Sequence, residues 1–278
     1  MRRKRTLVPV TPVALAASIG MVLALLAGCA TGDEEAYVER SVEELYNEAM
    51  DSLLADDLAA AVAGFLEVER QHPYSVWATR SQIMSAFVYY QGNRYDEAIA
   101  AAERFVELHP GHRDAAYGYY LIAISHYEQI SDVGRDQKTT ALALQALDEV
   151  ARRFPDSVYA RDARLKIDLA RDHLAGKEMT VGRYYLRRGN PVAAIGRFRM
   201  VVEQYQTTSH TPEALHRLTE AYLALGVPNE AQTSAAVLGH NYPGNRWYQH
   251  SYALLVDSEL EPEVDEGSWI SRVFGDVF

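Results

Sequence analysis

The sequence contains a single cysteine, Cys29, among 278 residues. A lone thiol cannot form a disulfide within the chain, and an unmodified odd cysteine is a liability in an oxidising compartment. Prolines number only 10 and glycines 17, whereas alanine, leucine, glutamate and arginine are abundant. This composition predicts a mostly helical chain. Cations are also scarce, with 27 Lys and Arg against 38 Asp and Glu, which argues against nucleic acid and anionic lipid headgroups as partners.

Signatures of catalysis and metal binding are missing as well. There is no HExxH, no P-loop and no glycine-rich fingerprint after a strand. The nearest candidate is the pair His109 and His112 in HPGH, but no third ligand lies nearby in the sequence and Pro110 belongs to a repeat pattern described below. We therefore interpret HPGH as a turn and predict a protein that is not an enzyme and holds no metal or cofactor.

The chain's long apolar run lies near its N-terminus. A basic start, with cations at positions 2 to 5, precedes an apolar stretch of 14 residues from Val13 to Leu26. A membrane-spanning helix needs about 20 such residues, so a cleaved signal peptide over residues 1–28 is favoured over a retained anchor. No second run of that length follows.

The residues LAGC, from 26 to 29, resemble the lipobox of bacterial lipoproteins. This resemblance implies that Cys29 is acylated at sulfur and becomes the mature N-terminus, followed by a linker over residues 29–39. Position 30 is alanine rather than aspartate, which by the sorting rule of such lipoproteins implies the outer membrane, with the protein facing the periplasm and held to the membrane by its lipid anchor only.

An internal repeat predicts the architecture. Five alanines mark it, and the spacings between them are 37, 45, 51 and 37 residues: Ala61, Ala98, Ala143, Ala194 and Ala231. Twelve residues after four of these alanines stands a proline, which ends a helix. This is the tetratricopeptide frame. Residues 40–255 are therefore predicted to be all-α, as a right-handed α-solenoid of five tetratricopeptide-type helical hairpins.

Two of the units are longer than the others, by 8 and 14 residues. The first insertion, around SDVGRDQKTT in the third unit, is either a helical extension or a loop. The second is predicted to lengthen the first helix of the fourth unit, starting at about Ser157. Both insertions approximate whole numbers of turns at 3.6 residues per turn, so the helical phase is nearly kept.

The lipobox, the irregular repeat spacing and the run VGRYYLRRGNPVAAIGRF together resemble the BamD family, the tetratricopeptide-repeat lipoproteins of the outer-membrane β-barrel assembly machinery. The resemblance covers residues 23 to about 255 and departs from the family at His72 and Gly196. It implies a non-enzymatic scaffold that joins a BamA-like barrel subunit and accessory lipoproteins and receives unfolded outer-membrane proteins. The alternative is a general periplasmic lipoprotein adaptor, for pilus biogenesis or envelope division.

The resemblance also implies two sites. The N-terminal units of the family capture the aromatic-ended signal of barrel precursors, and the candidates here are Tyr74, Trp77 and Tyr89, whose rings suit such a segment. The alternative is that these rings only staple the first two units together. Arg197 matches the family arginine that contacts the last periplasmic repeat domain of the barrel subunit, and Arg199 flanks it. The alternative is that both are exposed helix cations.

Residues 256–278 lie beyond the repeats. An acidic linker is followed by an apolar stripe that is typical of a short amphipathic helix: Trp269, Ile270, Val273, Phe274, Val277 and Phe278. A helix this short is marginal alone in water. Three alternatives follow: the tail docks on a partner or on the last repeats, it stays disordered, or it occupies the substrate groove of the first units as a competitor.

Overall fold

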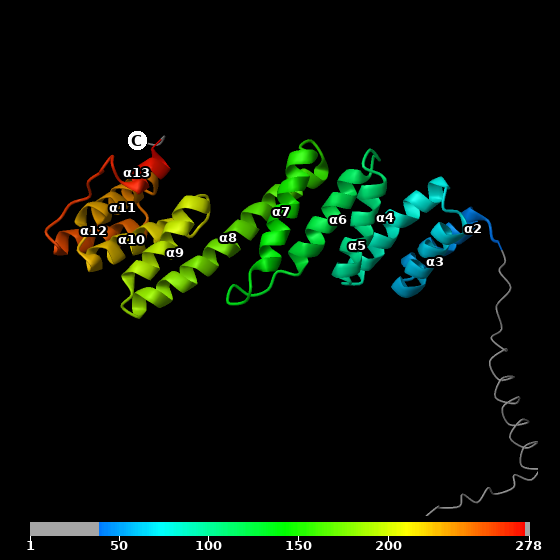
Figure 1. The fold of residues 1–278 in the computed structure, drawn as a ribbon, viewed down its shortest axis with the longest axis horizontal. Helices are drawn as coiled ribbons and strands as arrows, with labels where there is room; N and C mark the ends of the chain where they lie inside the picture. Colours follow the sequence, from blue (N-terminus) through cyan, green and yellow to red (C-terminus); the bar gives the residue numbers. More distant parts are fainter. Residues whose placement is uncertain (1–38, 276–278) are drawn as a thin grey trace, which may run out of the picture. The chain divides into compact units, whose positions relative to one another are not determined.

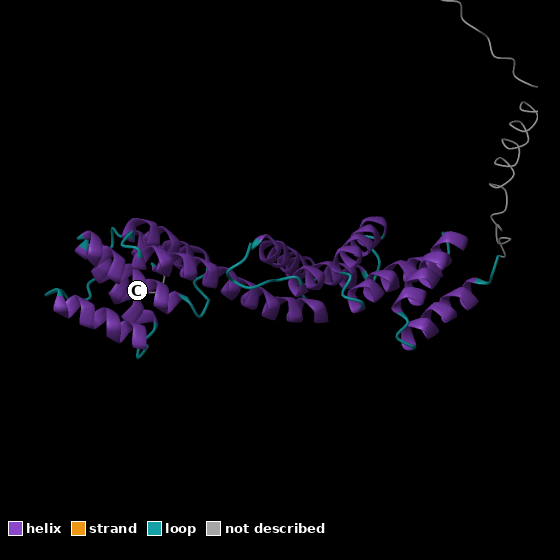
Figure 2. Cartoon of the chain, turned by 90° about the horizontal axis from the view of Figure 1, so that it is seen from below, coloured by secondary structure: helices purple, strands orange, loops and turns teal. Residues whose placement is uncertain are grey.

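The computed structural model describes residues 39–275, so Cys29, the predicted signal peptide and the last three residues lie outside the described part. The chain divides into two units, Met1–Ser41 and Val42–Phe278, and every helix described here belongs to the second. These residues form helices joined by loops (Figures 1 and 2). The helices are α2 (Val42–Leu54), α3 (Leu58–Gln71), α4 (Val76–Gln91), α5 (Tyr95–Leu108), α6 (Ala115–Glu128), α7 (Lys138–Arg153), α8 (Val158–Arg187), α9 (Pro191–Gln204), α10 (Thr211–Leu225), α11 (Pro228–Asn241), α12 (Arg246–Asp257) and α13 (Trp269–Phe274).

Helices α2 to α11 form five stacked hairpins. Each helix packs on the next along the chain, and the first helices of neighbouring hairpins also contact each other. Among the described residues, no comparable packing joins the second helices of neighbouring hairpins. All five marker alanines lie on the second helices and are completely buried. The predicted all-α fold of stacked hairpins is confirmed.

Local sequence signals set the helix boundaries. Helices α3, α4, α8 and α9 begin after an Asp, Ser or Asn whose side chain accepts a hydrogen bond from the backbone N–H three residues on. Helices α9, α10 and α11 carry a proline in the first two positions, where its missing N–H costs nothing. The prolines of the repeat pattern stand just after the ends of α3, α5, α7 and α11, in the turns that lead to the next hairpin.

The two insertions take different forms. Helix α8 runs for 30 residues from Ser157, which caps it, so the predicted lengthening of the fourth unit is confirmed. Residues 129–137 form a loop between α6 and α7, which settles the alternative left open for the third unit. The loop lies against the long helix, because the Nζ of Lys177 donates a hydrogen bond to the Gly134 carbonyl at 2.9 Å.

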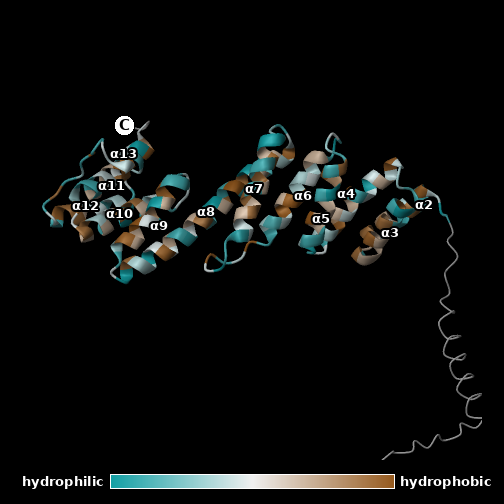
Figure 3. Cartoon of the chain, in the orientation of Figure 1, coloured by the Kyte–Doolittle hydropathy of each residue, from teal (hydrophilic) through white to brown (hydrophobic). Residues whose placement is uncertain are grey.

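Hydrophobic and hydrophilic residues occur within the same helices (Figure 3), as expected for amphipathic helices that pack on one another. None of the helices in residues 39–275 combines the length and the apolar character needed to cross a membrane. The largest buried cluster lies in the last two hairpins and includes Phe198, Leu215, Leu218, Val237 and Leu238.

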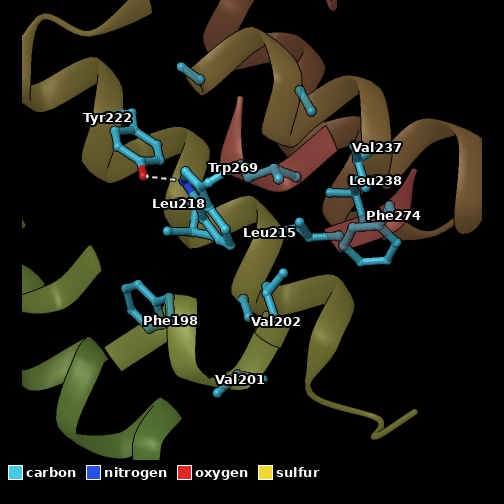
Figure 4. Packing of buried hydrophobic residues seen from close by; sticks show 14 of the residues in the cluster. Phe198, Val201, Val202, Leu215, Leu218, Tyr222, Val237, Leu238, Trp269 and Phe274 are labelled. Atoms are coloured by element: carbon cyan, nitrogen blue, oxygen red, sulfur yellow. Dashed lines mark hydrogen bonds between the residues drawn. The ribbon is translucent and has the colours of Figure 1, made fainter. Parts of the chain in front are cut away.

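The tail completes that cluster. Helix α12 ends at Asp257, two residues beyond the predicted end of the repeats, and residues 258–268 lead to α13. Trp269, Ile270 and Phe274 are buried against the last two hairpins (Figure 4). Of the three alternatives for the tail, the structure therefore has residues 269–274 docked on the last repeats rather than disordered or in the first units.

Candidate functional site

Tyr74 lies in the turn between α3 and α4 and is fully exposed, at 101% of its reference area. Its neighbour Val76, at the start of α4, is 70% exposed. This turn therefore presents an aromatic ring and a branched apolar side chain to solvent. Val76 was not among the predicted site residues, and its sequence context, an apolar residue after a helix-capping serine, gave no signal that it would be exposed.

Trp77 is partly buried in a stack of rings. Its ring centroid lies 4.7 Å from that of Tyr46 on α2, and Tyr46 in turn meets Phe65 edge-on at 5.5 Å. The guanidinium of Arg80 covers the indole, 5.1 Å from its centroid. Burial raises the pKa of Tyr46, and Arg80 opposes that shift. Trp77 thus packs α4 onto the first hairpin, as the alternative of a structural staple requires.

Tyr89 lies at the far end of α4 from Trp77. Twelve residues at 1.5 Å per residue place the two Cα atoms about 18 Å apart, and the helical rotation turns them to different faces. Tyr89 packs against the cluster of the first hairpin, and Arg94 lies over its ring at 4.8 Å. The three predicted aromatic residues therefore do not form one pocket, and Tyr74 is the one whose ring is free in the described structure.

Arg197 projects from α9 toward α8. Its Nη1 donates to a carboxylate oxygen of Glu178 at 3.0 Å, and its side chain remains 41% exposed. Glu178 is more buried, at 17% exposure. The arginine is therefore held by an acid within the chain, and its remaining N–H groups can still reach an outside carboxylate. Glu178 could not be identified from the sequence as a partner of Arg197, because the two residues lie 19 positions apart on different helices.

Arg199 is held by two groups. Its Nε donates to Glu203 one turn further along α9 at 2.8 Å, and its guanidinium lies 4.5 Å from the centroid of Trp269. The indole Nε1 of Trp269 donates to the Tyr222 hydroxyl at 2.9 Å (Figure 4). The tail thus contacts Arg199, one of the two predicted arginines, whereas Arg197 faces Glu178 on α8, a difference that no sequence pattern indicated.

The histidines take part in packing and hydrogen bonds. His109 lies in the turn after α5, with its Nε2 2.9 Å from Gln82 Oε1, and the ring of His112 meets Phe105 edge-on. Within residues 39–275 no cluster of three or more His, Cys, Asp or Glu side chains could hold a metal ion.

The most deeply buried histidine, His216, lies where α10 meets α12. Its Nδ1 is 2.9 Å from the Ser251 hydroxyl, and its ring stacks on Trp247 with centroids 5.1 Å apart. Burial lowers the pKa of His216 to about 4, and the positive charges of Arg217 and His250 add to this effect.

The low pKa of His216 predicts that the folded protein loses stability in acid. The unfolded chain protonates His216 near pH 6.5, whereas the folded chain keeps it neutral until about pH 4. The free energy of unfolding should be unaffected by this group above pH 6.5 and fall by roughly 2–3 kcal/mol as the pH drops through this window. Urea unfolding at a series of pH values measures the slope, and His216→Gln should flatten it. An unchanged slope in the variant would contradict the prediction.

Known proteins resemble this chain over most of its length. The sequence model of the YfiO family, described as an outer membrane lipoprotein, matches residues 38–238. The outer membrane protein assembly factor BamD of Caulobacter vibrioides is 53% identical over 88% of this chain and 81% of its own length. BamD of Rickettsia prowazekii is 42% identical over 85% of this chain and 93% of its own length.

Among solved structures, a thermophilic tetratricopeptide protein of Thermus thermophilus aligns with 77% of this chain and 98% of its own, at 18% identity and a TM-score of 0.36. The fold assignment rests on the helix packing described above. The family match spans most of the chain, and the relatives are matched over most of their length. The chain belongs to the BamD family of outer membrane lipoproteins, the outer membrane protein assembly factors.

Proposed function

We propose that this chain is a scaffold within the β-barrel assembly complex, with separate surfaces for unfolded outer-membrane proteins and for the barrel subunit. The observation that carries the proposal is the position of the two candidate surfaces. Tyr74 lies beside the second hairpin, whereas Arg197 and Arg199 lie on the second helix of the fourth. The five helices from α4 to α8 separate them along the chain, so one surface can be occupied without blocking the other.

Acylation of Cys29 is the third part of the proposal. The LAGC sequence supports it, as does membership of a family of outer membrane lipoproteins. Bacterial lipoproteins generally carry two or three acyl chains, and each buried CH₂ adds about 0.8 kcal/mol to membrane binding. Such an anchor would hold the repeat domain at the periplasmic surface of the outer membrane, into which the assembled barrel proteins are inserted.

The exposed turn at Tyr74 suits the aromatic-ended signal of a barrel precursor. A tyrosine ring offers a large, rigid contact area at a small loss of conformational entropy. Trp77 is already engaged with Tyr46 and contributes by holding the turn in place. Tyr74 is therefore the proposed contact with the signal, and Trp77 has a supporting role.

Replacing Tyr74 by alanine should separate binding from folding. Because the ring is fully exposed, the free energy of unfolding should change by less than about 0.5 kcal/mol. Affinity for a C-terminal signal peptide of a barrel protein should fall about 5- to 30-fold. Fluorescence anisotropy with a labelled peptide measures this.

Two further variants complete the comparison. Trp77→Ala should lower the free energy of unfolding by about 1–3 kcal/mol, because it removes one ring of the stack. Tyr252→Ala, which removes an exposed tyrosine on α12, should leave both affinity and stability unchanged. Full peptide affinity in the Tyr74→Ala protein would count against this turn as the binding surface.

On the other surface, Arg197 is proposed to engage a carboxylate of the barrel subunit's last periplasmic repeat domain. Arg197→Glu alone removes this contact, but it also places a second acid beside Glu178. The double variant Glu178→Arg/Arg197→Glu rebuilds the internal ion pair with its charges exchanged and still lacks a cation at position 197 of α9. It therefore separates the internal role of Arg197 from a role in docking.

Both the single and the double variant should lose binding to the purified repeat domain by at least about tenfold, because a desolvated charge pair across the interface is broken. The single variant should lose more stability than the double variant, because it leaves the mostly buried Glu178 beside a second acid, whereas the double variant keeps an opposite charge next to each position. Surface plasmon resonance and urea unfolding measure the two effects. Recovery of binding in the double variant would show that only the internal pair matters and would overturn the assignment.

A further inference from the structure

The second helices of neighbouring hairpins do not pack closely on each other, and the first helix of the later hairpin packs on both of them. We call the space between two such second helices, above that first helix, a groove. Side chains bridge the groove between α3 and α5. Arg104 on α5 pairs with Glu69 on α3, and the Nε2 of Gln82 on α4 donates to the same carboxylate at 3.2 Å. Gln82 also meets His109 at the end of α5. This groove is closed by polar contacts within the chain.

The tail fills the groove between α9 and α11. Trp269 of α13 bonds to Tyr222 on α10 below, and Arg199 on α9 covers its indole. The Ser268 hydroxyl donates to Glu230 on α11 at 2.7 Å. Leu215 and Leu218 on α10 are completely buried under this helix (Figure 4). The last groove of the stack therefore already holds a short helix with an aromatic anchor.

The groove between α5 and α7 has the same construction but no occupant in the described part of the chain. Counting from the buried Ala123 and Thr219, which hold the same repeat position in α6 and α10, Tyr119 and Ile122 correspond to Leu215 and Leu218. Tyr119 and Ile122 line a hollow with Val106 and Ala146, and both are partly exposed where Leu215 and Leu218 are completely buried. The floor that α13 covers in one groove is thus partly open in the other.

The two grooves differ in charge. Counting from Ala98 and Ala194, Glu103 stands where the α9–α11 groove has Arg199, and Glu107 stands where it has Glu203. Both acids line the hollow, as does Glu149 on α7. Glu149 is paired with Arg153 at 2.7 Å, whereas none of the ion pairs in the described part of the chain includes Glu103 or Glu107. The open groove therefore has an acidic rim.

Arg153 lies over the aromatic ring at the bottom of this groove. Its guanidinium is 4.8 Å from the centroid of Tyr119, and its Nη1 donates to the Tyr119 hydroxyl at 2.7 Å. In the filled groove, Arg199 and the Tyr222 hydroxyl contact the indole of Trp269. The open groove therefore also offers a cation and a phenol hydroxyl at which an indole can be received.

We propose that the α5–α7 groove binds a short amphipathic helix of another protein, with an aromatic anchor on its apolar face and Lys or Arg on its flanks. The anchor would pack on Ile122 and on the guanidinium of Arg153, which covers the Tyr119 ring, and the cations would face Glu103 and Glu107. Helix-in-groove recognition of this kind needs only a few apolar anchors at helical spacing. This groove is separate from the surfaces at Tyr74 and Arg197.

Two synthetic helical peptides test the groove on the full chain. Both contain the sequence of residues 268–274 and are extended at each end by two helical turns. In the full chain the α9–α11 groove is already occupied by the chain's own tail. One carries lysines on these extensions and the other glutamates. Each has a photo-crosslinking group in place of the indole of Trp269, so that mass spectrometry can identify the groove it enters.

The lysine peptide should bind with saturation and crosslink to α5, α6 or α7, and the glutamate peptide should bind at least about tenfold more weakly. Glu103→Lys/Glu107→Lys should exchange this preference. The control Asp51→Lys/Asp168→Lys changes the net charge by the same amount, at exposed positions on α2 and α8. It should leave the preference for the lysine peptide unchanged. Both pairs of positions are exposed, so the variants should fold.

Four outcomes would overturn the proposal. The first is binding that ignores the charges at positions 103 and 107. The second is crosslinking to α9 or α11, which would mean that the peptide only exchanges with the chain's own tail. The third is the absence of saturable binding by the lysine peptide. The fourth is self-association of the chain that is lost when residues 267–278 are deleted. It would show that the groove binds the tail of a second copy of this chain and not a helix of another protein.

Discussion

Replacing Trp269 by alanine should lower the free energy of unfolding of the repeat domain by about 3–5 kcal/mol, as truncation of a large buried aromatic residue does elsewhere. The indole is only 8% exposed, donates to Tyr222 and lies beneath Arg199. Its loss removes the anchor of a helix of six residues, which is too short to persist without packing. The last two hairpins would then expose the apolar surface that α13 covers.

Urea unfolding followed by circular dichroism measures this effect. Tyr222→Phe serves as a milder variant: it leaves the rings in place and removes only the hydroxyl that accepts the indole N–H, at a cost of about 1–2 kcal/mol. Deletion of residues 267–278 should cost at least as much as Trp269→Ala. Unchanged stability in the deletion protein would show that the tail does not pack on the last hairpins in solution.

The second large effect is expected at Gly182 on α8. A Cβ at this position would lie 2.4 Å from Cε1 and 2.8 Å from Cζ of Phe198, well inside contact distance. Phe198 is completely buried on α9 and cannot move aside without displacing its neighbours. We therefore expect Gly182→Ala to destabilise the fold by about 2–3 kcal/mol, despite the higher helix propensity of alanine.

Gly196 on α9 provides the matched control in the same hairpin. It lies within a helix, and no heavy atom outside its own helix turn lies within 4 Å of a Cβ built there. Gly196→Ala should therefore raise the free energy of unfolding by about 0.5–1 kcal/mol. Thermal melts of the two variants compare them directly. Stabilisation of the protein by both alanines would show that the close packing of α8 on α9 is not the reason why residue 182 is a glycine.

The contrast between these glycines shows what the repeat pattern could predict. The alanine frame located all five hairpins and the long helix of the fourth, because small residues at fixed spacing are a requirement of close helix packing. Gly182 stands twelve residues before the marker Ala194, at a position where the paired helix of the repeat also carries a small residue, whereas Gly196 has no place in the pattern. The choice between loop and helix for residues 129–137 could not be made, since a polar segment containing one glycine is compatible with both.

The site residues were predicted less completely than the fold. Tyr74 and Trp77 look equivalent in the sequence HPYSVWA, yet one is fully exposed and the other packs against the ring of Tyr46. Their difference depends on a contact with another helix, which local sequence does not encode. The same holds for the tail: its apolar stripe predicted a docked helix, but its acceptor and its contact with Arg199 are tertiary features.

The central claim, that one chain holds a substrate and the barrel subunit at the same time, can be tested by a bridging experiment. A C-terminal signal peptide of a barrel protein is fixed to beads, and the periplasmic repeat domains of the barrel subunit are added with or without this protein. We expect the repeat domains to be retained only when this protein is present, and Tyr74→Ala and Glu178→Arg/Arg197→Glu each to reduce retention. Equal retention without the protein, or no retention although each partner binds the protein separately, would show that one chain does not hold both partners at once.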